Sequence, residues 1–295
     1  MRAGMDLPNG RILEFRSRPM VMGIINVTPD SFSDGGVHLS PAIAIESALH
    51  MEREGAAIID VGGESTRPGA QPVPLQQELD RVIPIIEGIR RVSNVLISID
   101  TMKSPVALEA GRAGADILND VTALEFDEGM AGVARSLRLG VILMHIRGEP
   151  RTMQDSIHYD DVMSEIKTDL QSRIDHAVDC GIDPELLLID PGIGFGKTSE
   201  HNVEILARLS ELRELRPLVV GASRKGFIGK LTGKPGGPAR SAGSLAAAAA
   251  AANAGAAIVR VHDVAETVDF LEVFAAISAA ALKAYPAGPG VDGLR

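Results

Sequence analysis

The sequence is poor in aromatic residues and in cysteine. Only 3% of its 295 residues are aromatic, tryptophan is absent, and the one cysteine is Cys180. A single cysteine cannot form an intramolecular disulfide, so no such bond stabilises the fold. The scarcity of aromatic side chains gives no sign of the hot-spot surface expected of a protein that only binds another protein.

Positive charge and long apolar runs are also scarce. The chain has 29 lysine and arginine residues against 39 aspartate and glutamate residues, a net charge of −10, which argues against nonspecific binding to nucleic acid or to an anionic membrane. The first ten residues contain no apolar segment of the kind found in a signal peptide. The most apolar window, 242–259, is mostly alanine and glycine and is a poor membrane span. We therefore expect a cytoplasmic protein without nucleic-acid or membrane partners.

The sequence does contain a regular alternation of short apolar runs and helical stretches. The expected strands lie at 20–26, 57–61, 95–100, 116–119, 141–144, 186–190, 218–221 and 257–261. The expected helices lie near 40–54, 75–92, 104–113, 127–139, 160–180, 200–214, 241–254 and 263–283. Helix starts are indicated by Ser40-Pro41 and Ser104-Pro105. Helix ends are indicated by the glycines at positions 55, 114, 140, 181 and 255.

Eight apolar runs that alternate with helices indicate buried parallel strands. We predict an α/β protein with a single (β/α)8 TIM barrel over residues 20–283, an N-terminal lead at 1–19 and a flexible tail at 284–295. A doubly wound open sheet is the alternative, but the regular units without a break in composition favour closure. Active sites of such barrels lie at the C-terminal ends of the strands.

Polar residues follow the expected strands at those ends. They are Asn26, Asp60, Asp100, Asn119, Met144-His145, Asp190, Ser223 to Lys225, and Arg260 to His262. Because this set would converge on one barrel mouth, helix capping alone does not account for it. Asp60 has a second interpretation, in which its carboxylate only holds the neighbouring loop.

These residues combine two chemistries. A carboxylate can accept two parallel N–H bonds from the edge of an aminopyrimidinone-like ring, a task suited to Asp100 and Asp190, with Asn119 beside them. Positive charge for phosphates or a carboxylate would come from Arg67, Arg224, Lys225, Arg260 and His262. Hard oxygen donors suited to magnesium are present at Asn26, Asp30 and Asp34.

The segment 192–198 looks like a phosphate-binding loop but lacks the required spacing. Its sequence is Gly-Ile-Gly-Phe-Gly-Lys-Thr, and Pro191 occupies the position where the GxxxxGK[ST] pattern has its first glycine. We therefore assign no phosphate loop there.

Several segments together resemble the dihydropteroate synthase family of pterin-binding barrels. They are NVTPDSFSDGG (26–36), DVGGESTRPGA (60–70), SIDT (98–101), LND (118–120), MHIRGEPRTMQ (144–154), IDPGIGFGK (189–197), GASRKGFIG (221–229) and VRVHDV (259–264). The similarity covers nearly the whole barrel in the family's order. Many separate motifs in one order are a far more specific signal than any single motif.

The resemblance implies a transferase of folate biosynthesis. Members of the family condense 6-hydroxymethyl-7,8-dihydropterin diphosphate with p-aminobenzoate and release pyrophosphate, with magnesium assisting the loss of pyrophosphate. The family reacts through a cation-like step, which requires no general base because an arylamine is already nucleophilic. The resemblance also implies a homodimer formed by helices near the C-terminus.

The resemblance further implies a role for each matching residue. The pterin would be bound by Asp100, Asn119, Met144, Asp190, Lys225 and Arg260. The diphosphate would be held by Asn26, Arg67, Arg260 and His262, with Mg²⁺ on Asn26. The p-aminobenzoate pocket would be bordered by Phe32, Thr66, Arg67, Pro68, Phe195, Ser223 and Lys225. The catalytic groups, which act by charge and position, would be Asp100, Lys225, Arg260 and His262.

Two other functions are compatible with a barrel of this kind. A non-catalytic pterin-binding module, such as the methyltetrahydrofolate-binding module of corrinoid methyltransferases, would need the pterin pocket alone. The intact segments 26–36 and 64–69 count against it. A regulatory barrel that binds only a protein partner is the second alternative.

Overall fold

The structure is a computed structural model that describes residues 4–27, 40–67, 69–149 and 151–284. Its centre is an eight-stranded sheet with the order β8-β7-β6-β5-β4-β3-β10-β9. The strands are β3 (Met20–Asn26), β4 (Ile58–Gly62), β5 (Leu96–Asp100), β6 (Ile117–Asp120), β7 (Gly140–Met144), β8 (Leu187–Asp190), β9 (Val219–Val220) and β10 (Ile258–Val261). All neighbouring pairs in this sheet are parallel.

The sheet closes on itself between β8 and β9. A parallel bridge pairs Ile189 with Leu218, and the amide of Ile189 donates to the carbonyl of Pro217 at 3.1 Å. The predicted (β/α)8 barrel is therefore confirmed, and each of its eight strands lies within one or two residues of the expected position.

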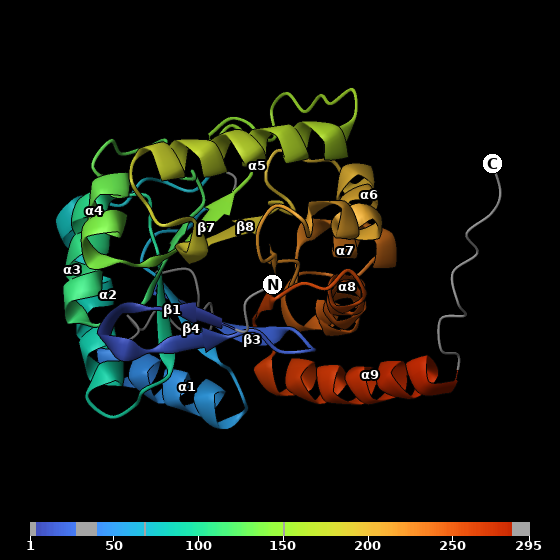
Figure 1. Ribbon diagram of the computed structural model, residues 1–295, viewed down its shortest axis with the longest axis horizontal. Coiled ribbons are helices and arrows are strands. Elements are labelled where there is room, and N and C mark those ends of the chain that lie inside the picture. Colours follow the sequence, from blue (N-terminus) through green and yellow to red (C-terminus); the bar gives the residue numbers. More distant parts are fainter. Residues whose placement is uncertain (1–3, 28–39, 68, 150, 285–295) are drawn as a thin grey trace.

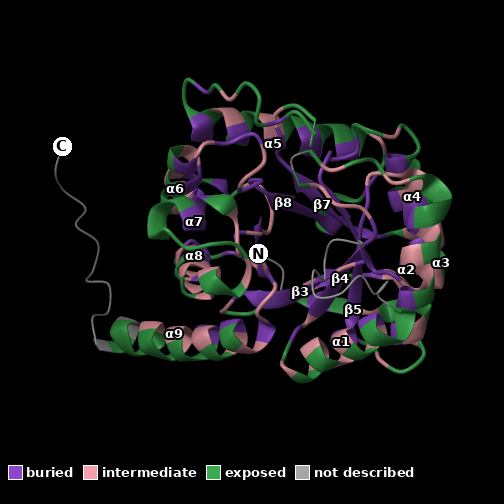
Figure 2. Ribbon diagram, turned by 180° about the vertical axis from the view of Figure 1, so that it is seen from behind, coloured by how far each residue is buried: buried purple, intermediate pink, exposed green. Residues whose placement is uncertain are grey.

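Helices surround the barrel (Figure 1). They are α1 (Pro41–Arg53), α2 (Leu75–Arg90), α3 (Ser104–Ala113), α4 (Met130–Leu137), α5 (Val162–Asp179), α6 (Ser199–Arg208), α7 (Gly226–Thr232), α8 (Ser241–Asn253) and α9 (Val264–Ala284). The buried residues gather on the strands and on the inward helix faces (Figure 2). Among the helices of the described chain, none has the length and apolar character needed to cross a membrane.

Two helical segments differ from the sequence prediction. The helix expected at 200–214 ends at Arg208 and continues as a 3-10 turn, η4 (Leu209–Leu212). Helix α7 was not predicted, because its seven residues contain two glycines and are too few to show helical periodicity. The unit that follows β9 therefore contains both α7 and α8.

The predicted helix boundaries are confirmed at most positions but wrong at two. Four of the five proposed glycines, at 55, 114, 181 and 255, have positive φ values and follow a helix. Helix α4 is instead capped by Arg138, with φ +53°, and Gly140 is the first residue of β7. Ser40 caps α1 by accepting from the amide of Ile43. Ser104 is instead the first helical residue of α3, and Lys103 precedes it without a side-chain cap.

The base of the barrel is covered by an antiparallel hairpin of β1 (Gly4–Asp6) and β2 (Ile12–Glu14). Its buried side chains Met5, Leu7 and Leu13 join one apolar cluster with residues of the barrel strands. Gly140 allows this approach, because a Cβ there would lie 2.9 Å from Leu7. Residues 4–14 of the predicted N-terminal lead at 1–19 thus close the barrel base. The expected tail beyond residue 284 lies outside the described residues.

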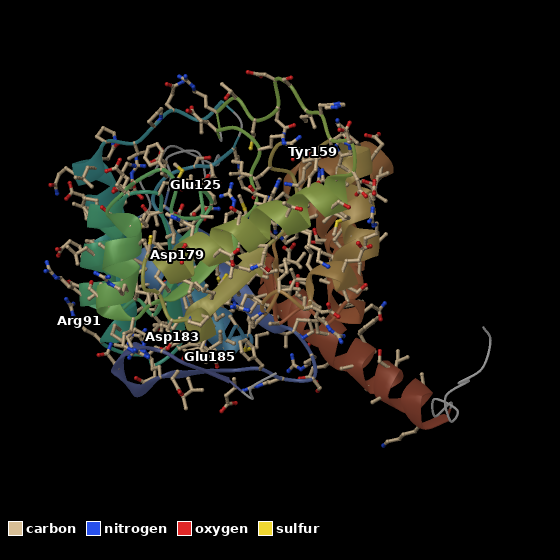
Figure 3. The ribbon with its side chains drawn as sticks, turned by 45° about the horizontal axis from the view of Figure 1, so that its top comes forward. Arg91, Glu125, Tyr159, Asp179, Asp183 and Glu185 are labelled. Carbon is tan, nitrogen blue, oxygen red and sulfur yellow. The ribbon has the colours of Figure 1, made fainter. Side chains whose placement is uncertain are left out.

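The two ends of the barrel can be followed in Figure 3. The side chains of Asp183 and Glu185 lie in the segment between α5 and β8, beside the hairpin at the base. Tyr159 lies toward the opposite end, before α5 begins. The hairpin occupies the base, so the polar strand ends are free to form the mouth.

The hairpin provides a test of what stabilises the barrel. Leu13 is fully buried, whereas its neighbour Ile12 is 55% exposed. We expect Leu13→Ala to lower the free energy of unfolding by about 2–5 kcal/mol, because it leaves a cavity in the base, and Ile12→Ala to change it by less than about 0.5 kcal/mol. Urea denaturation measures both; equal effects would contradict a packed hairpin.

Candidate functional site

The parallel register brings the predicted site residues together at the mouth. Gly62 of β4 pairs with Asp100 of β5, and Asp100 pairs with Asn119 of β6. On the next pair of strands, Met144 of β7 lies opposite Asp190 of β8. All of the polar members of this group are buried. The strand-end pattern of the sequence therefore corresponds to one compact group of side chains.

Arg260 connects three of the strands across this mouth. Its Nε donates to Oδ2 of Asp60 at 2.6 Å, and its Nη2 donates to Oδ2 of Asp100 at 2.7 Å. Asn119 donates from Nδ2 to the same oxygen of Asp60 at 3.3 Å. Burial opposes the charge of Arg260, but the carboxylates of Asp60 and Asp100 raise its pKa above the ordinary value. The guanidinium is therefore a fixed cation on β10.

The carboxyl of Asp100 is poised to change charge near neutral pH. Burial raises its pKa to about 7, against the opposing effect of Arg260 and with the help of the charge on Asp60. Asp190 also has a raised pKa because it is buried, although its Oδ1 accepts from the amide of Gly192 at 2.7 Å. Both side chains offer carboxylate oxygens to a ligand in the mouth.

Lys225 supplies the second cation, beside Asp190. Burial lowers the pKa of Lys225 to about 8, and the charge of Asp190 opposes that shift. Its Nζ donates to the carbonyl of Ile193 at 2.7 Å and lies 4.1 Å from the centre of the Phe195 ring. Gly221 lies beside both groups, because a Cβ there would be 3.7 Å from Oδ2 of Asp190 and 3.8 Å from Arg260.

An apolar cluster lies next to these charges. It contains Met144 with Val121, Ile146 and Met153, and the partly buried Phe195 and Met102 pack against it. Buried carboxylates, two cations and an apolar wall together suit a flat, polar heterocycle better than a flexible polar chain.

Ser223 and His262 meet on the β9–β10 side of the mouth. Nδ1 of His262 lies 3.1 Å from Oγ of Ser223, which also accepts from the amide of His262 at 3.2 Å. Burial lowers the pKa of His262 to about 4, and the charges of Arg260 and Arg224 lower it further. The sequence prediction of a positive charge at this position is therefore wrong: His262 is neutral at pH 7 and acts as a hydrogen-bonding group.

Arg224 is committed to a structural ion pair. It forms a salt bridge with Asp263, which also accepts from Ser241 at 2.7 Å. Its backbone has φ +58° and its amide donates to Ser244 at 2.9 Å. Arg224 therefore shapes the turn between Ser223 and Lys225, rather than presenting the unpaired phosphate-binding cation predicted from the sequence.

Lys197 and His145 form a buried pair that the sequence did not assign. Nζ of Lys197 donates to Nδ1 of His145 at 2.8 Å and to the carbonyl of Phe195 at 2.9 Å. Burial lowers the pKa of His145 to about 2, with Lys197 adding to the shift, so the imidazole is neutral. Lys197 thus holds the 192–197 turn in place through these contacts.

A second unassigned group anchors the segment that begins at Glu64. Lys103 forms salt bridges with Glu64 and with the fully buried Glu78. Glu78 also accepts from Oγ1 of Thr101 at 2.6 Å. These contacts fix the start of the loop that carries Thr66 and Arg67. The spacing in the sequence does not predict these contacts, because Glu64, Glu78 and Lys103 lie on three separate segments of the chain.

The remaining predicted residues lie at the rim of the mouth or outside the described chain. Asn26 ends β3 and is paired in register with Gly62. Arg67 is exposed and Thr66 is half-buried. Phe32 and Pro68, predicted for the p-aminobenzoate pocket, lie outside the described residues. The structure therefore brings together the residues predicted to bind the pterin, but it does not describe the whole of the predicted p-aminobenzoate pocket.

The oxygen donor of Asn26 suits a magnesium ion that has most of its ligands from phosphate and water. Within the described part of the chain, no three histidine, cysteine or acidic side chains form a metal-binding group. Asn26 offers one amide oxygen, and Asp30 and Asp34 lie outside the described residues. Magnesium often binds proteins through one or two side chains while phosphates and water complete its shell. The donor set thus fits magnesium that arrives with a diphosphate.

Known proteins share both this sequence and this architecture. The family model described as pterin binding enzyme matches residues 22–262. A dihydropteroate synthase of Escherichia coli is 49% identical over 271 residues, covering 91% of this chain and 95% of that protein.

Solved structures give the same result. A dihydropteroate synthase of Xanthomonas albilineans with 4-aminobenzoic acid is 48% identical, with a TM-score of 0.88 over 95% of this chain and 99% of that one. The same enzyme in complex with 7,8-dihydropteroate is 45% identical, with a TM-score of 0.84 over 94% of this chain and 99% of that one. The chain therefore belongs to the family of pterin-binding enzymes.

Proposed function

We infer that this chain catalyses the dihydropteroate synthase reaction of folate biosynthesis. It condenses 6-hydroxymethyl-7,8-dihydropterin diphosphate with p-aminobenzoate to give 7,8-dihydropteroate and pyrophosphate. The observation that carries the inference is the buried group of Asp100, Asn119 and Asp190 beside the cations Lys225 and Arg260. The similarity to synthases across at least 91% of the chain supports the same reaction.

The pterin occupies the deep end of the mouth in this proposal. Asp190 accepts from a ring N–H and the exocyclic amine, and Asp100 and Asn119 meet the other ring nitrogens. Lys225 reaches the carbonyl and N5 side of the ring, and Arg260 lies against a ring face. Met144 contributes apolar contact from the cluster that it forms with Val121 and Ile146.

The leaving diphosphate lies at the rim. Asn26, Arg67, Arg260 and His262 hold its oxygens, where added positive charge and hydrogen bonds stabilise the negative charge that develops as the C–O bond breaks. Magnesium, when bound with the diphosphate on Asn26, neutralises further charge on the leaving group. His262 contributes a hydrogen bond rather than a charge, because its pKa of about 4 leaves it neutral.

The p-aminobenzoate approaches from the side of Phe195, Ser223 and Lys225. The C–O bond to diphosphate breaks, the amine forms the new C–N bond with the cation-like pterin methylene, and the nitrogen then gives up a proton to the departing pyrophosphate. An arylamine needs no protein base for this attack, so Asp100, Lys225, Arg260 and His262 act by charge and position. Thr66 and Arg67 border this pocket, whose closure excludes water from the cation-like carbon; Phe32 and Pro68, which the resemblance also assigns to it, lie outside the described residues.

The non-catalytic alternative fits less well. A pterin-binding module would need the deep end of the mouth but not a rim that carries Asn26, Arg67 and His262. The anchoring of the 64–67 segment by Lys103 gives that rim a fixed starting point. A cytoplasmic location, expected from the sequence, remains part of the proposal.

Pyrophosphate release provides the first test of the function. We expect release to require dihydropterin diphosphate, p-aminobenzoate and magnesium together, and to stop in EDTA. Asp190→Ala should lower kcat/KM by about 100-fold or more, because a buried carboxylate that bonds the ring is lost. Asp179→Ala, at an exposed helix end, should leave it unchanged. Pterin binding without turnover would favour the non-catalytic alternative.

The pH profile of kcat/KM for dihydropterin diphosphate provides a second test. Asp100 has a pKa raised to about 7, so its accepting carboxylate forms as the pH rises through that value. Lys225 has a pKa lowered to about 8, so its charge is lost above it. We expect a maximum between these values. Lys225→Arg should remove the alkaline decline, because arginine stays charged; a decline unchanged by this variant would contradict the assignment.

We also propose that the chain forms a homodimer through α9. Val273 is 61% exposed and Ile277 is 64% exposed on this helix, and the rings of Phe270 and Phe274 stack nearby, with centroids 5.7 Å apart. Helix α9 lies at the edge of the barrel, so this face is open to a second copy (Figure 1). Exposed apolar faces of this kind are commonly buried in assemblies.

The dimer is tested by sedimentation equilibrium. Ile277→Glu should shift the protein from dimer to monomer, because it places a charge in an apolar interface. Val92→Glu is the matched control: Val92 is 66% exposed at the far end of α2, and this change should leave the mass unaltered. A wild-type monomer, or a dimer unaffected by Ile277→Glu, would contradict the proposed interface.

A further inference from the structure

We propose that Asp60 is a positioning residue, which holds Arg260 and Asn119 in the orientation that binds the pterin. The inference rests on the proposed function, because it concerns the same ligand. Asp60 is fully buried on β4 and lies below the ring site, so it acts on the ligand only through its neighbours. The sequence had left open whether Asp60 only holds the adjacent loop.

The hydrogen bonds of Asp60 distinguish it from three of the other buried aspartates, whereas Asp100 shares its partner Arg260. Asp116 accepts from the amide of Ile97, Asp120 from those of Thr122 and Leu124, and Asp190 from that of Gly192. Among the described residues, Asp60 accepts from no backbone amide, and its partners are the side chains of Arg260 and Asn119. A role in holding the loop is therefore not supported.

All of these bonds converge on one carboxylate oxygen. Oδ2 of Asp60 accepts from Nε of Arg260 at 2.6 Å and lies 2.5 Å from Nη2. Oδ1 of Asp60 has no hydrogen-bond partner in the described part of the chain. The negative charge of Asp60 is thus balanced through Arg260, so the two side chains form a single unit.

The contacts fix the plane of the guanidinium. Asp60 binds the edge of Arg260 that carries Nε and Nη2, and Asp100 accepts from Nη2. Hydrogen bonds to a guanidinium lie in its plane, so these acceptors leave both of its flat faces free. A guanidinium held in this way can lie parallel to a ring, which is the role proposed for Arg260 on the pterin.

Asp60 also determines how strongly Arg260 binds the carboxylate of Asp100. Nη2 of Arg260 donates to the same Asp100 carboxylate that the proposal assigns to the pterin. Without the charge of Asp60, Arg260 would depend on Asp100 alone and would compete with the ligand for it. Removal of Asp60 should therefore weaken pterin binding specifically and leave the p-aminobenzoate side unaffected.

The experiment compares Asp60→Asn with Asp116→Asn in steady-state pyrophosphate release. Asp116 is an equally buried carboxylate that pairs with Arg11 and Arg90 at the base of the barrel. We expect Asp60→Asn to raise KM for dihydropterin diphosphate about tenfold or more, as for the loss of a charged hydrogen-bond partner, with KM for p-aminobenzoate unchanged. Asp116→Asn should lower the unfolding midpoint and leave both KM values unchanged.

A double-variant comparison separates positioning from direct contact. The dissociation constant of a pterin without diphosphate is measured by calorimetry for Arg260→Ala and for Asp60→Ala/Arg260→Ala. If Asp60 acts mainly through Arg260, the two constants should differ by no more than about twofold. The double variant removes both buried charges together, whereas Arg260→Ala leaves Asp60 unpaired, so the unfolding midpoint of each variant is measured before binding is compared.

The outcomes distinguish this inference from the proposed function. An active wild-type protein whose Asp60→Asn variant keeps its pterin KM would overturn the positioning role and leave the function intact. A tenfold loss of binding between Arg260→Ala and the double variant would overturn the claim that Asp60 acts mainly through Arg260, because Asp60 would then act independently of that side chain. A wild-type protein that neither turns over nor binds a pterin would overturn the proposed function itself.

Discussion

The site depends on one constraint: a buried guanidinium must be matched by buried carboxylates. Arg260 extends from β10 past β3 to acidic groups on β4 and β5. Unpaired, each of these charges would be strongly destabilising at such depth. Paired, they form a rigid polar floor of the barrel mouth, made of Asp60, Asp100 and Arg260. The raised pKa of Asp100 and the lowered pKa of Lys225 follow from the same burial.

The barrel makes this arrangement possible by dividing its interior. The hairpin residues and the lower strand residues form an apolar cluster at the base, and the polar residues lie at the other end, where parallel strands finish together. Register then decides which side chains meet: Asp100 lies opposite Asn119 and Met144 lies opposite Asp190. Packing at the base and chemistry at the mouth are therefore separate requirements on the same strands.

The sequence predicted the eight strands because each is a short apolar run, and it predicted the strand-end residues because their positions follow from strand period and direction. It missed the pairs Lys197–His145 and Lys103–Glu64, whose partners are 52 and 39 residues apart, since only the folded loops bring them together. It also assigned a charge to His262, because burial and neighbouring cations cannot be read from spacing. The strand β1 and its pairing with β2 were not predicted, because a strand of three residues carries too little pattern.

A crystal structure with a bound dihydropterin would test the account most directly. The account predicts that the ring edge lies within hydrogen-bond distance of Asp190, and that the Arg260 guanidinium lies parallel to the ring while its Nε remains bonded to Asp60. A pterin bound away from Asp190, or an Arg260 that releases Asp60 on binding, would contradict the claim that this ion-paired floor organises the site.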